Sequence, residues 1–571
     1  MENNLTSPSR YCIAELSNNV LSDFETALKS LQSDQGELKL DDNVFRGVDG
    51  FLTKYFEKPS WSPALKDTIR GAKSADIVKL SKGIFNIVRL GTLMDWLVDF
   101  RSLFFTADPK IRFRCEPITT PGLNFSASIY FETEDISTAA GSTRVYGEYH
   151  HGDAPAASYD SGFLPFAARA LQVFKAQPTR YFLHAFILHG TTLELWVFDR
   201  AGAYSSELID LGQSPEELLR ILAGYGMMND KESGVNSLVK SLGPGLDSYV
   251  SLNYLVGLGT TCFAASKSTT DEPDIVVKFS WRADNTTTEP GLLWLAHKRG
   301  VKGIIKLLGY QDLVSIADLR QPLQFPSSFV NRTLSCLATS PLGRPIRKFT
   351  GIYELCRVMS DLVRAIQSLF EDGRMLHRDI AIKNLVITLQ VCGSPVGLLI
   401  DFDTALKVKK GHPVGQRVGS DGFMAIGVLR GEDHTYRHDL ESLFYVFLWL
   451  VIANDKEHDH ARDILERLSE KSRLQKWCSS DLDFHAVEEA VAADMSPKGF
   501  EGILGEFSPN FVELKDLARK LHGLLFPVHN GVIFTGTYKD EKAATWLFNE
   551  MADAFMAKTR SRKTRCKGHS H

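Results

Sequence analysis

Two short aliphatic runs, each bordered by polar residues, constrain this chain more than any other feature. Leu385-Val386-Ile387 follows Asn384 directly, and Leu398-Leu399-Ile400 leads directly into Asp401. Asp379 stands five residues before Asn384. Aliphatic runs of this length between polar residues are typical of short buried strands. The spacing therefore predicts two strands that carry a carboxylate, an amide and a second carboxylate, a pattern that an ordinary polar turn does not explain.

These residues belong to two longer motifs. The stretch His377-Arg378-Asp379-Ile380-Ala381-Ile382-Lys383-Asn384 resembles the catalytic loop of protein kinases, H-R-D-x-x-x-x-N. Asp401-Phe402-Asp403 resembles the D-F-G motif that follows it, with Asp403 in place of the glycine. The resemblance implies that Asp379 orients the acceptor hydroxyl and takes its proton, and that Asn384 and Asp401 bind Mg²⁺. His377 and Arg378 would support the loop.

A glycine-rich turn and a lysine strand precede these motifs. Val256-Gly257-Leu258-Gly259-Thr260-Thr261-Cys262-Phe263 resembles the loop that covers ATP phosphates, with Cys262 at the third glycine position. Ile275-Val276-Val277-Lys278-Phe279 resembles V-A-I-K, so Lys278 would hold the α- and β-phosphates. Glu289 opens the next helical run, which contains no other acid. It is therefore the expected partner of Lys278.

Two motifs after Asp401 continue the resemblance. Gly419-Ser420-Asp421-Gly422-Phe423-Met424-Ala425 would close an activation segment. Asp439 opens an apolar helix and would hydrogen-bond the backbone of the catalytic loop, as a structural residue. Gly427 replaces the glutamate of A-P-E, which puts the anchoring of the segment in question.

Together these motifs resemble the fungal-type protein kinase family over about residues 140 to 530. The resemblance rests on HRDIAIKN, LLIDFDTAL, GSDGFMA and HDLESLFYVFLWL, and upstream on Arg180-Tyr181-Phe182 and on 196–202 (WVFDRAG). It implies an α+β, two-lobed kinase-like fold with a β-rich small lobe and a helical large lobe, preceded by an α/β N-terminal domain. It also implies the use of ATP and Mg²⁺ and a protein substrate.

The pattern of elements predicts the domain organisation. A polar, glycine-bearing stretch at 227–245 marks the main boundary. The predicted parts begin with a helical region at 1–110 and a mixed α/β domain of unknown role at 111–240. A small lobe at 250–345, a large lobe at 346–555 and a basic disordered tail at 556–571 follow.

Composition limits the partners and the compartment. The formal net charge is -4, so the whole chain has no general attraction to nucleic acid or anionic membrane, and only the basic tail leaves a nucleic-acid or nuclear-localisation role open. Eight scattered cysteines without a C-x-x-C pair indicate a reducing compartment. Leu440 to Ala453 is too short to span a membrane. We therefore expect an intracellular protein, cytoplasmic or nuclear.

Three functions remain open from the sequence. The first is transfer of the ATP γ-phosphate to a protein hydroxyl, of Ser or Thr rather than Tyr. The second is a small-molecule kinase of the aminoglycoside or choline type, which Arg378 and the Asp439 helix disfavour. The third is a pseudokinase that acts as a nucleotide-gated interaction module. Cys262 and Gly427 favour this third function, and the intact Lys278, Asp379, Asn384 and Asp401 argue against it.

One further pattern lies outside the kinase motifs. Gly147-Glu148-Tyr149-His150-His151 partly resembles the E-x-K half of a nuclease core, with His150 where the lysine belongs. The simpler interpretation is a strand end whose polar groups are satisfied by their neighbours.

Overall fold

The computed structural model describes most of the chain and divides it into two compact units. The described residues are 43–71, 74–105, 111–118, 125–133, 142–152, 158–236, 248–250, 258–268, 271–284, 288–389, 394–408, 417–453, 468–469, 471–478, 483–538 and 540–566. The first unit comprises Met1–Phe263, Lys278–Asn285 and Gln311–Cys336, and the second comprises Ala264–Val277, Thr286–Tyr310 and Leu337–His571. The expected mixed α+β class is confirmed. The domain bounds predicted from the sequence remain predictions.

An eight-stranded sheet forms the centre of the first unit. Its order is β1-β7-β6-β5-β4-β3-β2, and β8 pairs with β6. The strands are β1 Val44–Phe45, β2 Ile111–Pro117, β3 Ser126–Thr133, β4 Thr143–His150, β5 Phe182–His189, β6 Thr192–Asp199, β7 Gly202–Ser205 and β8 Ile209–Asp210. Strands β2, β3 and β4 are antiparallel, whereas β4 and β5 are parallel. Parallel neighbours need a crossover, which helix α5 (Ser158–Ala176) supplies between β4 and β5.

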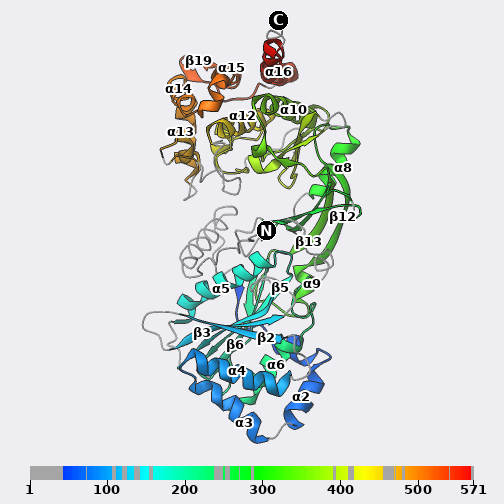
Figure 1. Cartoon of the computed structure of the whole chain (residues 1–571), viewed down its shortest axis with the longest axis vertical. Helices are drawn as coiled ribbons and strands as arrows, with labels where there is room; N and C mark the ends of the chain where they lie inside the picture. The colour runs from blue at the N-terminus through cyan, green and yellow to red at the C-terminus, as the bar shows by residue number, and fades with distance from the viewer. Residues whose placement is uncertain are drawn as a thin grey trace, which may run out of the picture. The chain divides into compact units, whose positions relative to one another are not determined.

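Helices cover both faces of this sheet. In Figure 1, α5 lies on one face, and α2, α3, α4 and α6 lie on the other. These four helices are α2 Ser62–Gly71, α3 Ser74–Gly83, α4 Leu90–Phe104 and α6 Glu216–Met227, with the short η3 Thr53–Glu57 and η4 Ile84–Asn86 between them. Each face has its own hydrophobic core. Helix α4, for example, buries Trp96, Phe100 and Phe104 against the sheet because these residues recur at helical spacing.

A segment from much later in the chain completes the same core. Helix α9 (Ile316–Arg320) and the loop after it belong to the first unit, and Leu323 is buried among the residues of its core. The Arg320 guanidinium donates to both carboxylate oxygens of Asp199, at 2.8 and 2.9 Å, and both side chains are at most 2% exposed. The rings of Phe325 and Phe329 lie on this guanidinium. The ion pair and the rings tie the segment to the end of β6.

A second sheet has five strands in the order β12-β13-β11-β10-β9. They are β9 Ser248–Val250, β10 Thr261–Ala265, β11 Ile275–Ala283, β12 Lys306–Ser315 and β13 Arg332–Ser340. The bounds of the two units pass within β10, β11, β12 and β13. Helix α8 (Glu289–Lys298), in the second unit, is capped by the Thr288 side chain and has proline at its second position.

The rest of the second unit is mainly helical. Its helices are α10 Ile352–Glu371, α11 Ile426–Leu429, α12 Tyr436–Ile452, α13 Phe484–Asp494, α14 Pro497–Gly505, α15 Lys515–Leu525 and α16 Glu541–Cys566, with η6 Ile346–Lys348, η7 Ile382–Asn384, η9 Arg473–Trp477 and η10 Pro509–Leu514. Its short strands are β14 Arg344–Pro345, β15 Met375–Leu376, β16 Leu385–Leu389, β17 Pro395–Leu399, β18 Leu406–Lys407, β19 Val528–His529 and β20 Val532–Ile533. Every residue of α12 from Tyr436 to Val451 is buried, as expected for an apolar helix inside a large domain.

The last helix of the chain reaches into the segment predicted as a basic disordered tail. Residues 556–566 form the last part of α16, and 567–571 lie outside the described residues. Phe548, Met551 and Phe555 stabilise the helix because they are buried in the core of the second unit. The Ala, Lys and Arg residues that follow have high helix propensity and favour its continuation.

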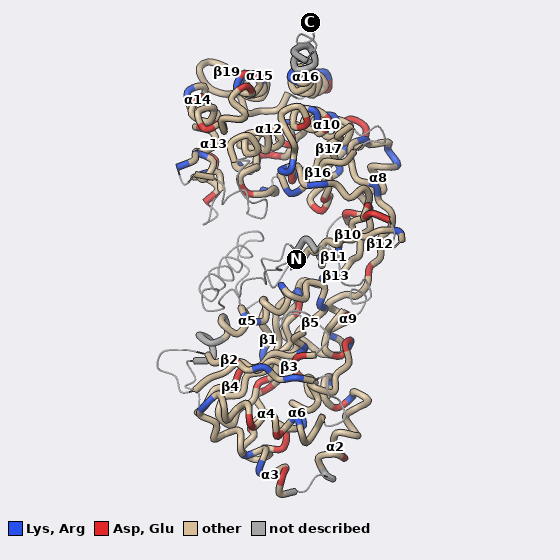
Figure 2. Tube along the Cα trace, in the orientation of Figure 1, with Lys and Arg blue, Asp and Glu red and all other residues tan. Residues whose placement is uncertain are grey.

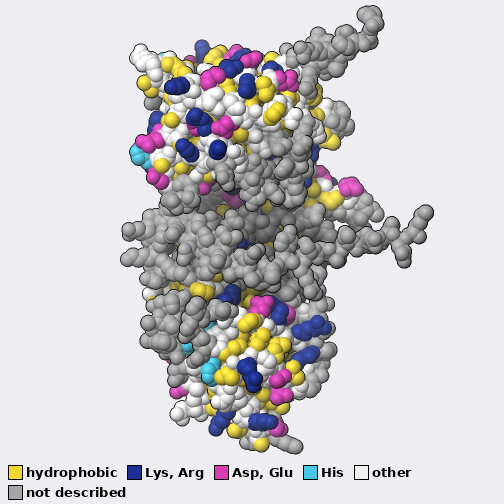
Figure 3. All heavy atoms as spheres, turned by 60° about the vertical axis from the view of Figure 1, so that its left-hand side comes forward, with side chains coloured by type: hydrophobic (Ala, Val, Ile, Leu, Met, Phe, Trp, Pro, Cys, Tyr) yellow, Lys and Arg dark blue, Asp and Glu magenta, His cyan; other side chains and the backbone are white. Residues whose placement is uncertain are grey.

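The surface carries mixed charge. Figure 2 shows Lys and Arg interspersed with Asp and Glu along the described parts of both units. Figure 3 shows one face, where hydrophobic side chains gather in the lower part of the view. Exposed aliphatic residues of α3, α4 and the turn between them include Val78, Val88, Met94 and Val98. In the part of the chain that the structure describes, no helix combines the length and the apolar character needed to cross a membrane.

Candidate active site

The two strands expected from the aliphatic runs are β16 and β17, and they pair in an antiparallel register. Leu385 lies opposite Leu399, and the Ile400 amide donates to the Asn384 carbonyl at 3.0 Å. This pairing places the end of the catalytic-loop motif beside the start of Asp401-Phe402-Asp403. Strand geometry, set by buried Leu and Val side chains, therefore brings the two motifs together.

A buried aspartate of α12 accepts hydrogen bonds from the backbone of the catalytic loop. Asp439 is 1% exposed and accepts hydrogen bonds from the backbone amides of His377 and Arg378, at 2.9 and 3.0 Å. His434 donates to the same carboxylate at 2.9 Å. Burial alone would raise the pKa of Asp439, but His434 and the amide of His377 outweigh it and the pKa is lowered. Arg378 has a left-handed backbone (φ 69°), which is unfavourable for residues other than glycine, and the two hydrogen bonds to Asp439 stabilise it.

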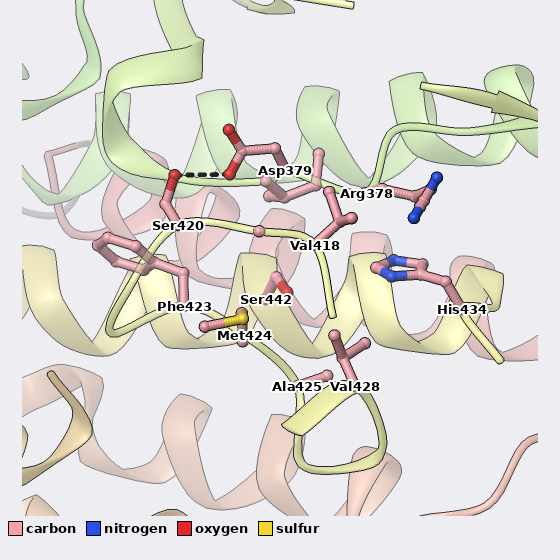
Figure 4. A pocket seen from close by; sticks show the side chains of 12 residues that line it. Arg378, Asp379, Val418, Ser420, Phe423, Met424, Ala425, Val428, His434 and Ser442 are labelled. Atoms are coloured by element: carbon pink, nitrogen blue, oxygen red, sulfur yellow. Dashed lines mark hydrogen bonds between the residues drawn. The ribbon is translucent and has the colours of Figure 1, made fainter. Parts of the chain in front are cut away.

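The Asp379 carboxylate lies at the centre of this loop. It is 8% exposed, and the Asn384 side-chain amide donates to its Oδ2 at 2.9 Å. The Ser420 hydroxyl donates to Oδ1 at 2.6 Å, the dashed line in Figure 4, and Lys383 Nζ lies 3.6 Å from Oδ2. A pocket beside it is lined by residues of the loop, the activation segment and α12, among them Asp379, Ser420, Phe423, Met424, His434 and Ser442.

Three acidic side chains gather next to the loop. Carboxylate oxygens of Glu289, Asp401 and Asp403 lie within 4.8 Å of one another. Glu289 comes from α8, is 4% exposed, and accepts a hydrogen bond from the Phe402 amide at 2.9 Å. Asp401 has a left-handed backbone (φ 64°), which this bond to the next residue helps to hold. Carboxylate oxygens at this spacing are the ligands that Mg²⁺ prefers, so the donor set fits the ion expected from the sequence. The Asn384 amide nitrogen faces Asp379, which leaves its oxygen as the atom able to join a metal site.

The predicted nucleotide-side residues belong to the first unit. Gly257 lies outside the described residues. Gly259 has φ 50°, and the carbonyl of Leu258 before it accepts a hydrogen bond from the Trp281 amide at 2.7 Å. Lys278 lies in β11 and is 8% exposed. The pairing of Lys278 with Glu289 stays a prediction.

The activation segment is anchored in a way that the sequence did not reveal. The Ile426 amide donates to Glu441 of α12 at 2.7 Å, and Glu441 also accepts from the Tyr445 hydroxyl at 2.7 Å and pairs with Arg437 one helical turn earlier. A β-carbon at Gly427 would lie 2.5 Å from His438 Nε2, so no larger residue fits there. The segment, whose anchoring Gly427 put in question, is thus held by Glu441, which forms a buried ion pair with Arg437 of the same helix.

Four residues of the site had no assigned role in the sequence interpretation: Asp403, Ser420, His434 and Glu441. Asp403 carried a usable signal, since it follows Asp401 by two residues and breaks the D-F-G pattern. Ser420 lay in a recognised motif. His434 acts through the Asp439 carboxylate and Glu441 through the Ile426 amide, and neither contact has a local signature in the sequence.

A base-like carboxylate on a strained loop, beside three acids that suit a divalent cation, defines a protein-kinase-like chain. The family model described as fungal protein kinase matches residues 132–451, more than half of the 571 residues. The chain therefore belongs to the fungal protein kinase family, which confirms the resemblance drawn from the motifs, and such a family uses ATP and Mg²⁺ in general. A search of curated proteins found no match.

Proposed function

We propose that this chain is an ATP- and Mg²⁺-dependent protein kinase that transfers the γ-phosphate of ATP to a Ser or Thr hydroxyl. The observation that carries the proposal is the setting of Asp379, whose carboxylate is oriented by Asn384 and already accepts a hydroxyl hydrogen bond from Ser420. In the reaction, the acceptor oxygen forms a bond to the γ-phosphorus, the bond from that phosphorus to the ADP oxygen breaks, and the hydroxyl proton goes to Asp379.

Metal binding is assigned to the acids beside the loop. Asp401, Asp403 and Asn384 would hold Mg²⁺, which neutralises charge on the phosphates when bound. Glu289 holds the backbone of this segment at Phe402, so it keeps Asp401 in its left-handed conformation. Gly257, Gly259 and Lys278 would bind the phosphates from the nucleotide side. His377, Arg378 and Asp439 would support the catalytic loop.

The contact of Ser420 with Asp379 supports the choice of acceptor. The short Ser420 side chain on the activation segment brings its hydroxyl within 2.6 Å of Asp379 Oδ1. The backbone of the segment therefore lies one serine side chain away from the Asp379 carboxylate. An acceptor presented along this segment would approach Asp379 with an arm of similar length, as Ser and Thr have and Tyr does not.

The organisation and location expected from the sequence complete the proposal. The family's two lobes would correspond to residues 250–345 and 346–555, after an α/β domain that ends near 240. The scattered cysteines without a C-x-x-C pair support a reducing, intracellular environment.

The test is a phosphoryl-transfer assay on the full-length protein with radiolabelled ATP and Mg²⁺. Generic protein acceptors and a panel of aminoglycosides and choline are offered in parallel, and the Asp379→Asn variant is the matched control. Label on Ser or Thr of a protein, lost in the variant, is the expected result. Label on the small molecules alone would indicate the alternative kinase class, and Mg²⁺-dependent ATP binding without any transfer would indicate a pseudokinase.

A further inference from the structure

The WVFDRAG motif of the first unit surrounds a fully buried arginine. Arg200 lies in the turn between β6 and β7 and is 0% exposed. Asp199 shapes this turn, since its Oδ1 accepts from the Ala201 amide at 2.8 Å. Gly202 allows the turn to close, because its φ is 135° and a β-carbon there would lie 2.0 Å from the Asn43 carbonyl oxygen. The motif therefore fixes where the Arg200 side chain starts.

The Arg200 side chain ends against the glycine-rich turn. Its Cζ lies 4.7 Å from the centre of the Phe174 ring, and Nη2 lies 3.5 Å from the Pro178 carbonyl oxygen. A β-carbon at Gly259 would lie 2.9 Å from Cζ and Nε and 3.1 Å from Nη2 of Arg200. The backbone of Gly259 thus packs directly on the guanidinium, and a larger residue there would have to displace the Arg200 side chain and adopt φ 50°, which favours glycine.

A second arginine adds positive charge at the same place. Arg332 of β13 lies close enough to lower the pKa of Arg200, and burial and this repulsion together bring that pKa to about 9, so Arg200 stays protonated at neutral pH. Arg332 Nη1 reaches the Trp281 carbonyl at 3.5 Å, and its Nε is buried with no hydrogen-bond partner among the described residues. Asp199 also acts on Arg200 electrostatically, but its carboxylate is paired with Arg320. Arg200 and Arg332 thus form a pair of neighbouring cationic side chains in this part of the first unit.

We propose that Arg200, with Arg332 beside it, is a positioning residue for nucleotide: it fixes the Gly259 turn from behind and places positive charge next to the phosphates of ATP. The inference rests on the proposed function, because it takes the Gly259 turn to be the phosphate-covering loop. Charge in a buried, weakly screened setting acts over several ångströms, so direct contact with the phosphates is not required. The WVFDRAG motif, which lies upstream of the kinase motifs, would then contribute to nucleotide binding.

The experiment compares three ligands on full-length protein with Mg²⁺ present. Dissociation constants for ATP, ADP and adenosine are measured by calorimetry for the wild type, Arg200→Met, Arg200→Lys and Arg332→Met. Arg220→Met, which changes a half-buried arginine paired with Glu217 in α6, is the matched control. We expect Arg200→Met to weaken the binding of ATP about tenfold, to weaken the binding of ADP less and to leave the binding of adenosine unchanged. Arg200→Lys should restore part of the lost ATP affinity. Arg332→Met should weaken ATP about threefold, again without effect on adenosine.

The outcomes separate this inference from the proposed function. If the wild type binds ATP and the Arg332 and Arg200 variants bind it equally well, the inference is wrong and the proposed function stands. Equal losses of affinity for ATP and for adenosine would mean that Arg200 has a purely structural role, which would also overturn the inference. If Arg200→Met does not fold, Arg332→Met decides, because Arg332 is only half-buried. Absence of any ATP binding by the wild type would remove both.

Discussion

Each of the two units holds a partly buried cluster of ionisable side chains, and the two clusters differ in the charges that they combine. In the second unit, Glu289, Asp401 and Asp403 bring three carboxylates within 4.8 Å. In the first unit, Glu148 of β4 meets an arginine and a histidine instead: Arg169 Nη1 lies 2.7 Å from one of its oxygens and His150 Nε2 lies 3.0 Å from the other. One cluster is an all-acid donor set, and the other is largely neutralised by its own neighbours.

This difference distinguishes a site from a structural cluster. Burial raises the pKa of Glu148, but His150 and Arg169 outweigh it, so the pKa is lowered and the carboxylate is ionised. His150 Nδ1 also meets the Ser126 hydroxyl at 2.9 Å. Glu148 and His150 of the E-x-K-like pattern therefore have hydrogen-bond partners within the unit, as the simpler interpretation expects, whereas the buried Nδ1 of His151 has none among the described residues. Three neighbouring carboxylates repel one another, and a divalent cation relieves that repulsion.

The largest expected effect comes from the acid cluster. Asp401→Asn should abolish the Mg²⁺-dependent rise in melting temperature that ATP gives the wild type, because it removes a charged metal ligand. Thermal unfolding with and without Mg²⁺ measures this, and Glu148→Gln is the matched control that removes a buried acid from the other cluster. An ATP effect of the same size without Mg²⁺ would contradict the metal assignment.

The base position should show a large effect confined to turnover. Asp379→Asn should lower kcat by about 10² to 10⁴ while the affinity for ATP stays nearly unchanged, since Asp379 faces the acceptor. Steady-state kinetics and calorimetry on the same preparation separate the two quantities. A variant with full activity would show that Asp379 is not the base.

Breaking the ion pair of α12 should cost folding free energy. Glu441→Gln leaves Arg437 buried beside a neutral amide, and both side chains are at most 3% exposed. We expect a loss of about 3–5 kcal/mol, the range for removing one partner of a buried pair. Urea denaturation of the second unit's transition measures it. A loss below about 1 kcal/mol would argue against this pair as the anchor of Ile426.

The corresponding change in the first unit should cost less. Glu148→Gln removes the charge that pairs with Arg169, but Arg169 is 31% exposed and water can replace the lost contact. We expect about 1–3 kcal/mol of lost stability and unchanged ATP affinity. Weakened ATP binding in this variant would mean that the first cluster takes part in the site.

Acid should weaken the first unit through a buried histidine. Burial, with Arg180 and Lys54 nearby, lowers the pKa of His184 to about 3. Between pH 6.5 and 3 the unfolded chain binds a proton that the folded chain does not, so this contribution to stability is lost as pH falls below 6.5. The slope should be about 1.4 kcal/mol per pH unit. Denaturation at pH 7.0 and 5.5 should show a smaller pH dependence in His184→Gln than in the wild type.

Local motifs predicted the family and the local strand-and-loop structure far better than they predicted the long-range contacts that hold this structure in place. The strands β16 and β17, the loop from His377 to Asn384 and the family itself follow from short-range patterns, because strand pairing and loop chemistry are encoded in neighbouring residues. Arg200 beneath Gly259 and Asp199 with Arg320 join residues dozens of positions apart. Such contacts depend on the sheet order of the whole unit, which a single sequence does not state.

The Arg320–Asp199 ion pair also determines when the first unit can finish folding during protein synthesis. A ribosome releases the chain from the N-terminus, and the sheet of the first unit is complete in sequence by Asp210. Its core nevertheless takes Leu323, and Asp199 has its guanidinium partner only when Arg320 has emerged, 121 residues after Asp199. A nascent chain stalled before this point carries a buried carboxylate without its cation and an open hydrophobic face. The first unit should therefore reach its final stability only when much of the five-stranded sheet has been translated.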